Sequence, residues 1–394
     1  MQKFKIILVK NWQKSAILAA VCAIAYGLVF FRLNRPALLS SQELSTYIGS
    51  HFIKSIFHYP LNAPYNLVEN LILRLHYSLV FIRATSAIYA IIIILLLFYI
   101  LKSWLGIIYA ASGSVVFASS SWFLQAARFN SPNIMLLGFL APVACGIWIK
   151  RAHNRSLAIA ISGLAVGLVF YIPGLIWFIL AGIISERKTL LRALKRCSVR
   201  LLILTVVLIL IILSPLIWSF VQHPSTVRQF FAIPYDLHWY RGVLFNLIRI
   251  PGEIFWRGPF SPVHWLGRLP ILNVFEAVML LLGVLAFWQN RKLDRTRILL
   301  IGLLLGCWLV ALNGPAELTV ILPFLYVLIA TGFVYVWELW RSVFPVNPFA
   351  KAAGALILTV AILFSCNYHT REYFVAWQNN ADTKAVYTQK LPEI

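Results

Sequence analysis

The chain has 394 residues, of which 61% are hydrophobic and 12% are charged, against roughly 25% charged residues in soluble domains. This composition excludes an ordinary soluble globular protein and predicts an all-α, polytopic integral membrane protein. The net charge of +22 does not indicate nucleic-acid binding, because the basic residues lie mainly between apolar segments, where they set the orientation of membrane helices.

Apolar runs that approach the roughly 20 residues needed to cross a bilayer predict about eleven membrane helices, within a range of about 10–13. In chain order they cover residues 15–31, 84–101, 104–120, 132–149, 157–184 (as two short helices), 201–218, 271–288, 298–312, 318–337 and 352–366. Pro173 and Gly174 interrupt the run at 157–184, and a dense basic stretch follows it. A hairpin broken at this Pro-Gly pair keeps that basic stretch on the cytoplasmic side.

Four lysines precede the first helix and predict a cytoplasmic N-terminus; they are Lys3, Lys5, Lys10 and Lys14. Two long loops, at about 32–80 and 219–270, then lie outside. We expect them to carry amphipathic helices that lie on the membrane, since Leu44, Ile48 and Phe52 recur at helical spacing. The polar tail after residue 366 also ends outside. The pattern predicts one transmembrane domain over 1–394, without a soluble domain, in a prokaryotic plasma membrane.

Acidic residues are scarce, with 12 Asp and Glu in the whole chain. The first long loop holds Glu43 and Glu69, and the second holds Asp236 and Glu253. An acid near a membrane interface is costly to desolvate and is therefore a functional candidate, although a solvated loop acid is the simpler interpretation of any single one. A further acid, Glu276, lies near the start of the helix expected at 271–288.

Arginines on the outer side oppose the usual charge bias of membrane proteins. Among them are Arg128, Arg241 and Arg257. Arginine suits the bidentate binding of a phosphate, as in a phosphate-linked lipid; attraction to anionic headgroups explains the same charge. The loop histidines fit no metal spacing, and the chain has no HExxH, P-loop or GxSxG motif. We therefore predict no metal site and name no certain cofactor, with a divalent cation as the alternative.

Several features recur in a fixed order over the first 140 residues. They are Gln42-Glu43 followed by Tyr47, the stretch Asn62-Ala63-Pro64-Tyr65, Arg83 with Ser86 three residues later, Gly106, and the segment from Ser119 to Asn133 that contains Arg128 and Pro132. This order resembles the type-C (GT-C) membrane glycosyltransferases, in particular their protein O-mannosyltransferase and aminoarabinose-transferase branch. The chain departs from that pattern at Gln42 and Asn133, where acids are usual, and it lacks the soluble C-terminal domain of many relatives.

The resemblance implies a membrane enzyme that transfers a sugar, with inversion, from a polyprenyl-phosphate donor to a lipid, glycan or protein acceptor on the outer face. It implies that Glu43 acts as the general base on the acceptor hydroxyl, or orients it. The residues expected to bind substrate are Tyr47, Arg128, Asn130, Asn133, Asp236, Arg241, Glu253 and Arg257. It also implies a GT-C-like module over about 1–185, followed by a second membrane portion over about 186–394.

Two alternatives stay open. The first is a transporter or flippase of a lipid-linked sugar, which would place its cavity near the middle of the membrane and would use a buried acid such as Glu276. The second is a non-catalytic, lipid-binding relative, which the departures at Gln42 and Asn133 favour. A transferase should instead have a cavity at the outer interface, with Glu43 on its wall.

Overall fold

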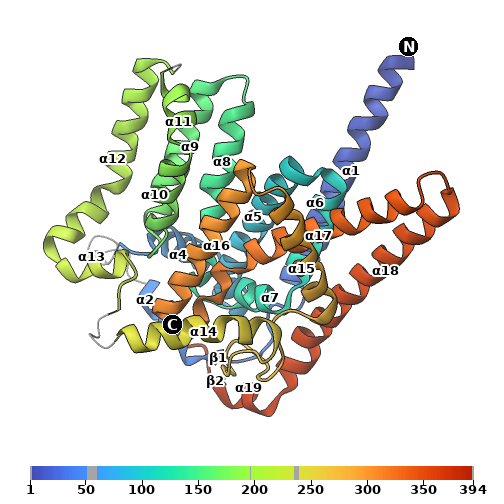
Figure 1. Ribbon diagram of the computed structural model, residues 1–394. Coiled ribbons are helices and arrows are strands. Elements are labelled where there is room, and N and C mark those ends of the chain that lie inside the picture. The colour runs from blue at the N-terminus through green and yellow to red at the C-terminus, as the bar shows by residue number, and fades with distance from the viewer. Residues whose placement is uncertain (1, 51–59, 196, 235–238, 393–394) are drawn as a thin grey trace.

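The computed structural model describes residues 2–50, 60–195, 197–234 and 239–392, and its described part is almost entirely helical (Figure 1). Seven of the described helical segments are long and apolar enough to cross a bilayer. They are α1 (Gln2–Phe30), α5 (Leu79–Leu105), the 3-10 helix η1 (Pro132–Phe139) with α8 (Leu140–Arg151), α12 (Val199–Gln222), α16 (Asp294–Asn313), the 3-10 helix η2 (Pro315–Val320) with α17 (Leu322–Val343), and α18 (Pro348–Arg371).

Three shorter apolar helices and one bent pair complete the membrane part that the structure describes. They are α9 (Arg155–Val169), α10 (Ile176–Ser185), α15 (Val274–Gln289), and the pair α6 (Ile107–Ser119) and α7 (Ser121–Arg128), bent by 67°. These elements lie, in chain order, where the eleven membrane segments were expected, which confirms the predicted fold class. The expectation of a simple turn after residue 120 was wrong, because the chain continues there as α7.

The hairpin expected around Pro173 and Gly174 is present between α9 and α10. Gly174 has a φ of +78°, a conformation that side-chain-bearing residues rarely adopt, and Ala232 and Leu309 lie where a Cβ atom would extend. A helix could not continue through this point, so the Pro-Gly pair acts as the break that the sequence suggested.

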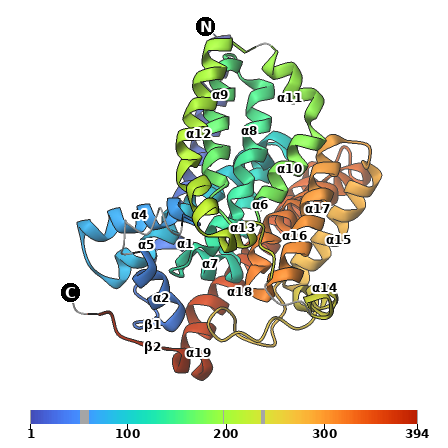
Figure 2. The same ribbon diagram turned by 90° about the vertical axis from the view of Figure 1, so that its left-hand side faces the viewer.

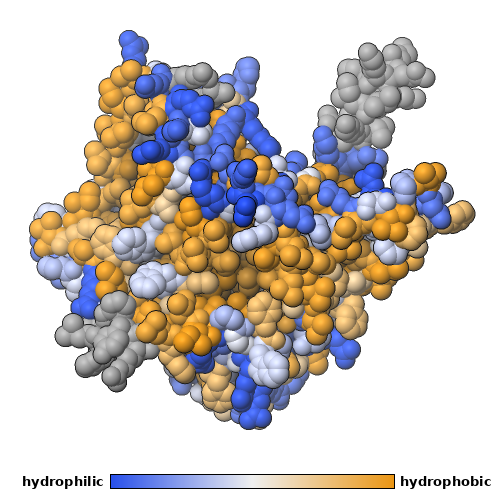
Figure 3. Space-filling model, viewed as in Figure 1, coloured by the Kyte–Doolittle hydropathy of each residue, from blue (hydrophilic) through white to orange (hydrophobic). Residues whose placement is uncertain are grey.

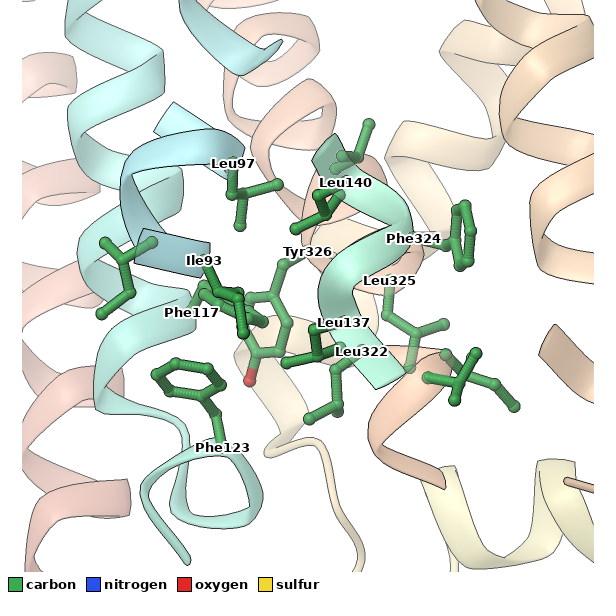
Figure 4. Close-up of a cluster of buried hydrophobic side chains, with 14 of the residues drawn as sticks. Ile93, Leu97, Phe117, Phe123, Leu137, Leu140, Leu322, Phe324, Leu325 and Tyr326 are labelled. Atoms are coloured by element: carbon green, nitrogen blue, oxygen red, sulfur yellow. The ribbon is translucent and has the colours of Figure 1, made fainter. Parts of the chain in front are cut away.

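The core is centred on α17, whose spanning window is 78% buried. Large apolar side chains from α5, α6, α7, η1 and α8 pack against its first turns (Figure 4). Their labelled members are Ile93, Leu97, Phe117, Phe123, Leu137, Leu140, Leu322, Phe324, Leu325 and Tyr326. Helix α15 crosses α17 at Gly283 and Gly332, where an added Cβ would collide with the partner's backbone; small residues allow this close approach between membrane helices.

Helices α12 and α18 stand at the periphery, each with a spanning window only 11% buried. Their exposed side chains are mainly Leu, Ile, Val and Phe, as expected for surfaces that face lipid acyl chains. The space-filling view shows an apolar band across the face in view, with hydrophilic residues gathered above and below it (Figure 3). This distribution matches a protein embedded in a bilayer.

Two faces lie on opposite sides of this band. The basic face carries the N-terminus and α11 (Arg187–Leu194), and the contacts Arg151 Nη2 to Ser103 O and Arg297 Nη2 to Ser185 O join helix ends there. The loop face carries α2 (Ser41–Ser50), α14 (Trp239–Phe255), α19 (Ala381–Val386) and a β-ribbon (Figures 1 and 2). Two further short helices, α4 (Ala63–Leu75) and α13 (Pro224–Phe230), complete the described elements of the long loops.

The ribbon is an exception to the all-helical expectation. Strand β1 (Leu39–Ser40) pairs antiparallel with β2 (Tyr387–Gln389), so the C-terminal tail lies beside the start of α2. The tail was expected to be polar from residue 367, but α18 continues to Arg371 and a π-helix, η3 (Glu372–Trp377), follows it. This long-range pairing leaves no local pattern in the sequence.

Helix α2 is amphipathic, as predicted. Its buried stripe is formed by Glu43 and Tyr47, four residues apart, whereas Leu44 is half-buried and Ile48 is 53% exposed. The apolar residues thus face outward, which suits a helix that lies on a membrane, and Phe52 lies outside the described residues. The motif residues Glu43 and Tyr47 point into the protein.

Candidate active site

Glu43 and Arg83 form a buried ion pair at the junction of α2 and α5. Arg83 Nε donates to Glu43 Oε1 at 2.8 Å and Arg83 Nη2 donates to Oε2 at 3.1 Å, with both side chains at most 1% exposed. The N–H of Ser40 also donates to Oε2, and the N–H of Glu43 donates to the Ser40 hydroxyl, a reciprocal cap at the start of α2. Burial of these charges is tolerable only because each has its partner in place.

Asn130 joins this pair to a second buried acid. Its backbone N–H donates to Glu43 Oε1 at 3.3 Å, its side-chain Nδ2 donates to Glu69 Oε1 at 2.8 Å, and its Oδ1 accepts from the Tyr65 hydroxyl at 2.6 Å. The Ser86 hydroxyl lies 2.8 Å from the Tyr65 hydroxyl and donates to the Phe129 carbonyl. We call these six residues the Glu43–Asn130 network: Glu43, Tyr65, Glu69, Arg83, Ser86 and Asn130.

The network unites residues that are far apart in the sequence. Glu43 and Asn130 were predicted site residues, whereas its other four members were not. Tyr65 and Glu69 stand four residues apart on α4, so they share one helix face, and this spacing was the available signal. Burial raises the pKa of the Tyr65 hydroxyl well above its usual range, and the carboxylate of Glu69 raises it further. The Tyr65 hydroxyl therefore stays protonated and donates a hydrogen bond to Asn130 Oδ1.

Arg128 does not have the role predicted for it. Its guanidinium is 2% exposed and donates to the carbonyls of Val29, Phe31 and Arg32, at 2.9, 2.6 and 2.7 Å, and to the Tyr373 hydroxyl. These carbonyls lie in the last turn of α1 and in the two residues just after it, where a cation offsets the helix dipole. The donors are directed at the protein itself, so Arg128 anchors α1 and is not placed to bind a phosphate.

A cavity of about 350 Å³ lies beside the network. We call it the amide cavity, because four carboxamide side chains line it: Asn62, Asn133, Gln229 and Asn313. Three prolines and several apolar side chains form the rest of its described wall. Asn62 precedes α4 and Asn133 follows Asn130 by three residues, so the cavity and the network share two segments of chain. Asn133, which was predicted to bind substrate, lines this cavity, whereas Glu43 is not among the lining residues.

The amide cavity lies near the C-terminal end of α16, which is the end farther from the basic face. Helix α16 runs for 20 residues from Asp294 to Asn313, which corresponds to about 30 Å and so to the thickness of the hydrocarbon core. Asn313 therefore lies at the interface on the loop face. This position meets one part of the expectation for a transferase, a cavity at an interface, and differs from the midplane cavity expected for a transporter. The other part, Glu43 on the cavity wall, is not met.

A second cavity, of about 360 Å³, lies at the C-terminal end of α14. We call it the arginine cavity, because Arg249, Arg257 and Arg268 line it together with Glu253. Two of the predicted residues, Glu253 and Arg257, thus meet in one site. Trp256 and Phe260 also line it and are 84% and 80% exposed.

Glu253 is paired with Arg249 across one turn of α14, with Arg249 Nη2 2.9 Å from Glu253 Oε1. Burial raises the pKa of the Glu253 carboxyl, and the nearby Arg249 charge only partly opposes this rise. The outward side of α14 carries Leu244, Phe245 and Ile248, each at least 59% exposed. The helix is therefore amphipathic and suited to the membrane interface, with a basic cavity at its end.

Of the predicted residues not yet placed, Tyr47 lines neither cavity. Tyr47 is buried, with its ring centroid 5.9 Å from that of Tyr77. Asp236 lies outside the described residues, as does the side chain of Arg241. Among the described residues, no group of three His, Cys, Asp or Glu side chains could hold a metal ion.

A second buried polar cluster lies between α15, α17 and α18. His369 Nε2 lies 2.9 Å from Glu276 Oε2, and His369 Nδ1 lies 3.2 Å from Glu372 Oε2. Ser365 donates to Glu276 Oε1 at 2.8 Å, and Ser121 at the start of α7 donates to Glu372 Oε2 at 2.8 Å. Glu276 is thus held by protein groups and lines neither described cavity.

Helix α7 is held at both ends by η3. Glu372 accepts from Ser121 at the first residue of α7, and the Tyr373 hydroxyl accepts from Arg128 at its last residue. The segment that follows α7 carries Asn130 into the Glu43–Asn130 network. The C-terminal part of the chain therefore positions the central residue of the candidate site.

No family model matches the sequence, and no curated protein matches it significantly. The fold is similar to solved structures. ArnT from Cupriavidus metallidurans in the apo state has a TM-score of 0.56 at 13% identity, with 96% of this chain and 78% of that chain covered. ArnT bound to undecaprenyl phosphate has a TM-score of 0.56 at 14% identity, with 93% and 76% covered.

An oligosaccharyltransferase from Archaeoglobus fulgidus, in complex with Zn and sulfate, is also similar. Its TM-score is 0.56 at 16% identity, and the alignment covers 96% of this chain and 54% of that chain. At these identities the likeness concerns the fold. This chain therefore shares the fold of ArnT and of this archaeal oligosaccharyltransferase.

Proposed function

We propose that the protein is a membrane glycosyltransferase that takes a sugar from a polyprenyl-phosphate donor. The observation that carries this proposal is the arginine cavity at the end of an amphipathic interfacial helix, in a chain with a GT-C fold. Three guanidinium groups suit a phosphate, and exposed aromatic and aliphatic side chains beside them suit the lipid attached to it. One solved structure with this fold, ArnT, is bound to undecaprenyl phosphate.

In this proposal the loop face is the outer face of a prokaryotic plasma membrane, with the N-terminus in the cytoplasm. The density of Lys and Arg on the basic face supports this orientation. A phosphate-linked lipid is then a suitable donor, because soluble nucleotide sugars are not supplied outside the cytoplasm. The acceptor is a hydroxyl-bearing lipid, glycan or protein.

Glu43 acts in this proposal through the residues it holds. Its carboxylate would have to release Arg83 before it could accept a proton from an acceptor hydroxyl, so we assign it a positioning role in place of the general base. It fixes Asn130 and, through that segment, the wall of the amide cavity. Glu253 is the one carboxylate among the described residues that line the two cavities. We propose a single displacement with inversion, the stereochemical outcome that the family resemblance implies.

The structure gives less support to a transporter. Both described cavities involve the loop-face ends of helices, and Glu276, the acid that would favour transport, is bonded to Ser365, His369 and Tyr326. A cavity at one interface serves a transferase, which needs only one-sided access.

Replacing Arg257 by glutamine is expected to weaken the binding of undecaprenyl phosphate by roughly tenfold or more, because a charged hydrogen bond contributes about 1.5–3 kcal/mol. Binding would be measured by titration of the lipid into purified protein in nanodiscs. The matched control is Arg291→Gln, which removes an exposed arginine near the basic face. Equal affinities for the wild type and both variants would contradict a phosphate site at Arg257.

Replacing Glu253 by glutamine is expected to strengthen the binding of a polyprenyl phosphodiester several-fold near neutral pH. The carboxylate competes with the phosphate for Arg249, and its raised pKa means that it is protonated as the pH falls. Wild-type affinity should therefore rise as the pH is lowered and Glu253 becomes protonated, because a phosphodiester keeps its single charge over the same change.

The Glu253→Gln variant should show much less of this pH dependence, because it lacks the titrating group. A series of affinities against pH for the two proteins, with the same phosphodiester, measures the difference. Parallel pH profiles would argue that Glu253 does not regulate the cavity.

A further inference from the structure

The wall of the amide cavity differs chemically from that of the arginine cavity. Its polar side chains are Asn62, Asn133, Gln229 and Asn313, and none of its described lining residues is charged. A carboxamide presents a donor and an acceptor side by side, which matches a hydroxyl group that both donates and accepts. Pro132, Pro173 and Pro234 add rigid apolar surface to the same wall.

The two described acids of the Glu43–Asn130 network are directed elsewhere. The Glu43 carboxylate is paired with Arg83, and the Glu69 carboxylate accepts from the Asn130 amide; both side chains are completely buried and neither lines the cavity. A cationic or anionic ligand group would therefore lose its hydration without meeting a described counter-charge, which is costly. An uncharged polyhydroxyl ligand would exchange water for amide hydrogen bonds at little cost.

The size and location of the cavity agree with a small ligand. Its volume of about 350 Å³ falls in the range of roughly 300–1,000 Å³ that is typical of small-molecule sites. Asn133 is three residues from Asn130, and Asn62 stands just before the helix that carries Tyr65 and Glu69. Movement of the Glu43–Asn130 network would thus be transmitted directly to two of the four amides.

We propose that the amide cavity binds an uncharged sugar ring, a neutral hexose or pentose without an amino or carboxyl group, through Asn62, Asn133, Gln229 and Asn313. The assignment deepens the proposed function and rests on it for the reaction in which the sugar takes part. The ring belongs either to the donor or to a glycan acceptor, and both present the same hydroxyl chemistry.

The test uses the purified full chain in nanodiscs and three soluble probes: methyl glucopyranoside, its 4-amino-4-deoxy analogue and methyl glucuronide. Saturation-transfer NMR compares their affinities without any lipid-linked donor. The neutral glycoside is expected to bind at least tenfold more tightly than either charged analogue. Equal binding of the charged analogues, or no binding of the neutral glycoside, would overturn the proposal.

Asn133→Asp adds a carboxylate to the wall and is expected to improve the binding of the amino sugar by roughly tenfold. The control Asn380→Asp adds the same charge at the N-cap of α19, where aspartate caps as well as asparagine, and should change nothing. If Asn133→Asp does not fold, Asn313→Asp, at the exposed end of α16, makes the same test. Unchanged amino-sugar binding in a folded cavity variant would reject the assignment.

Competition separates the two sources of the sugar. Displacement of the glycoside by undecaprenyl-phosphate hexose, but not by undecaprenyl phosphate, assigns the ring to the donor; retention in both cases assigns it to the acceptor. Both results support a site for a neutral sugar in the amide cavity. The proposed function fails separately, if undecaprenyl phosphate does not bind while the preference for the neutral glycoside persists.

Discussion

Replacing Glu43 by glutamine is expected to lower the free energy of unfolding by about 3–5 kcal/mol and to reduce sugar transfer by 10²-fold or more. The change leaves the buried Arg83 guanidinium without its counter-charge, and it removes the carboxylate that holds the Asn130 backbone. Unfolding in detergent, followed by the thermal midpoint, measures the first effect. A transfer assay with a polyprenyl-phosphate sugar measures the second.

Two further variants separate a positioning role from a general-base role. Arg83→Met keeps the Glu43 carboxylate but removes its partner, and a positioning role predicts losses as large as those of Glu43→Gln. The double variant, with Glu43→Gln and Arg83→Met, should recover stability, because no unpaired buried charge remains. If Glu43→Gln lost transfer with an unchanged unfolding midpoint, Glu43 would be a base and our reading of the ion pair would be wrong. Glu338→Gln, an exposed acid on α17, is the matched control.

Replacing His369 by leucine is expected to cost a similar amount of stability, about 3–5 kcal/mol. The imidazole is the shared partner of Glu276 and Glu372, and all three side chains are at least 95% buried. Leucine would leave two carboxylates in an apolar interior. Because Glu372 also anchors Ser121, α7 should lose part of its support, and transfer should fall as well.

The control for His369→Leu is Thr370→Val, which changes the adjacent residue and removes only a hydroxyl bonded to its own helix. Converting Glu276 and Glu372 to glutamine in the same chain should restore part of the stability that His369→Leu loses. An unfolding midpoint equal to that of the control would show that the cluster does not stabilise the fold.

Most of the membrane architecture could be predicted because its cause is local. Long apolar runs must form helices in lipid, and the Pro173-Gly174 break has its own backbone chemistry. The bend before α7, the β-ribbon and the continuation of α18 into η3 could not be predicted, because each depends on a contact between distant segments. The ribbon, for example, joins residues near 40 to residues near 388.

The candidate site, too, could be predicted in part. The motif order predicted which segments meet, and Asn130, Asn133, Glu253 and Arg257 all lie in the network or in a cavity wall. The role of a charged residue depends on the residue that it contacts, and the sequence does not show which distant residues come into contact. Arg128 was expected to bind phosphate but caps α1. The expected division of the membrane domain near residue 185 stays a prediction.

The proposed function depends most on the lipid-phosphate donor. Native mass spectrometry of the full chain, released from the membrane in a mild detergent, tests it directly. We expect a co-purified polyprenyl-phosphate sugar on the wild type, retained in Arg291→Gln and lost in Arg257→Gln. Bulk phospholipids alone on all three proteins, with no polyprenyl phosphate even after it is supplied, would contradict the account.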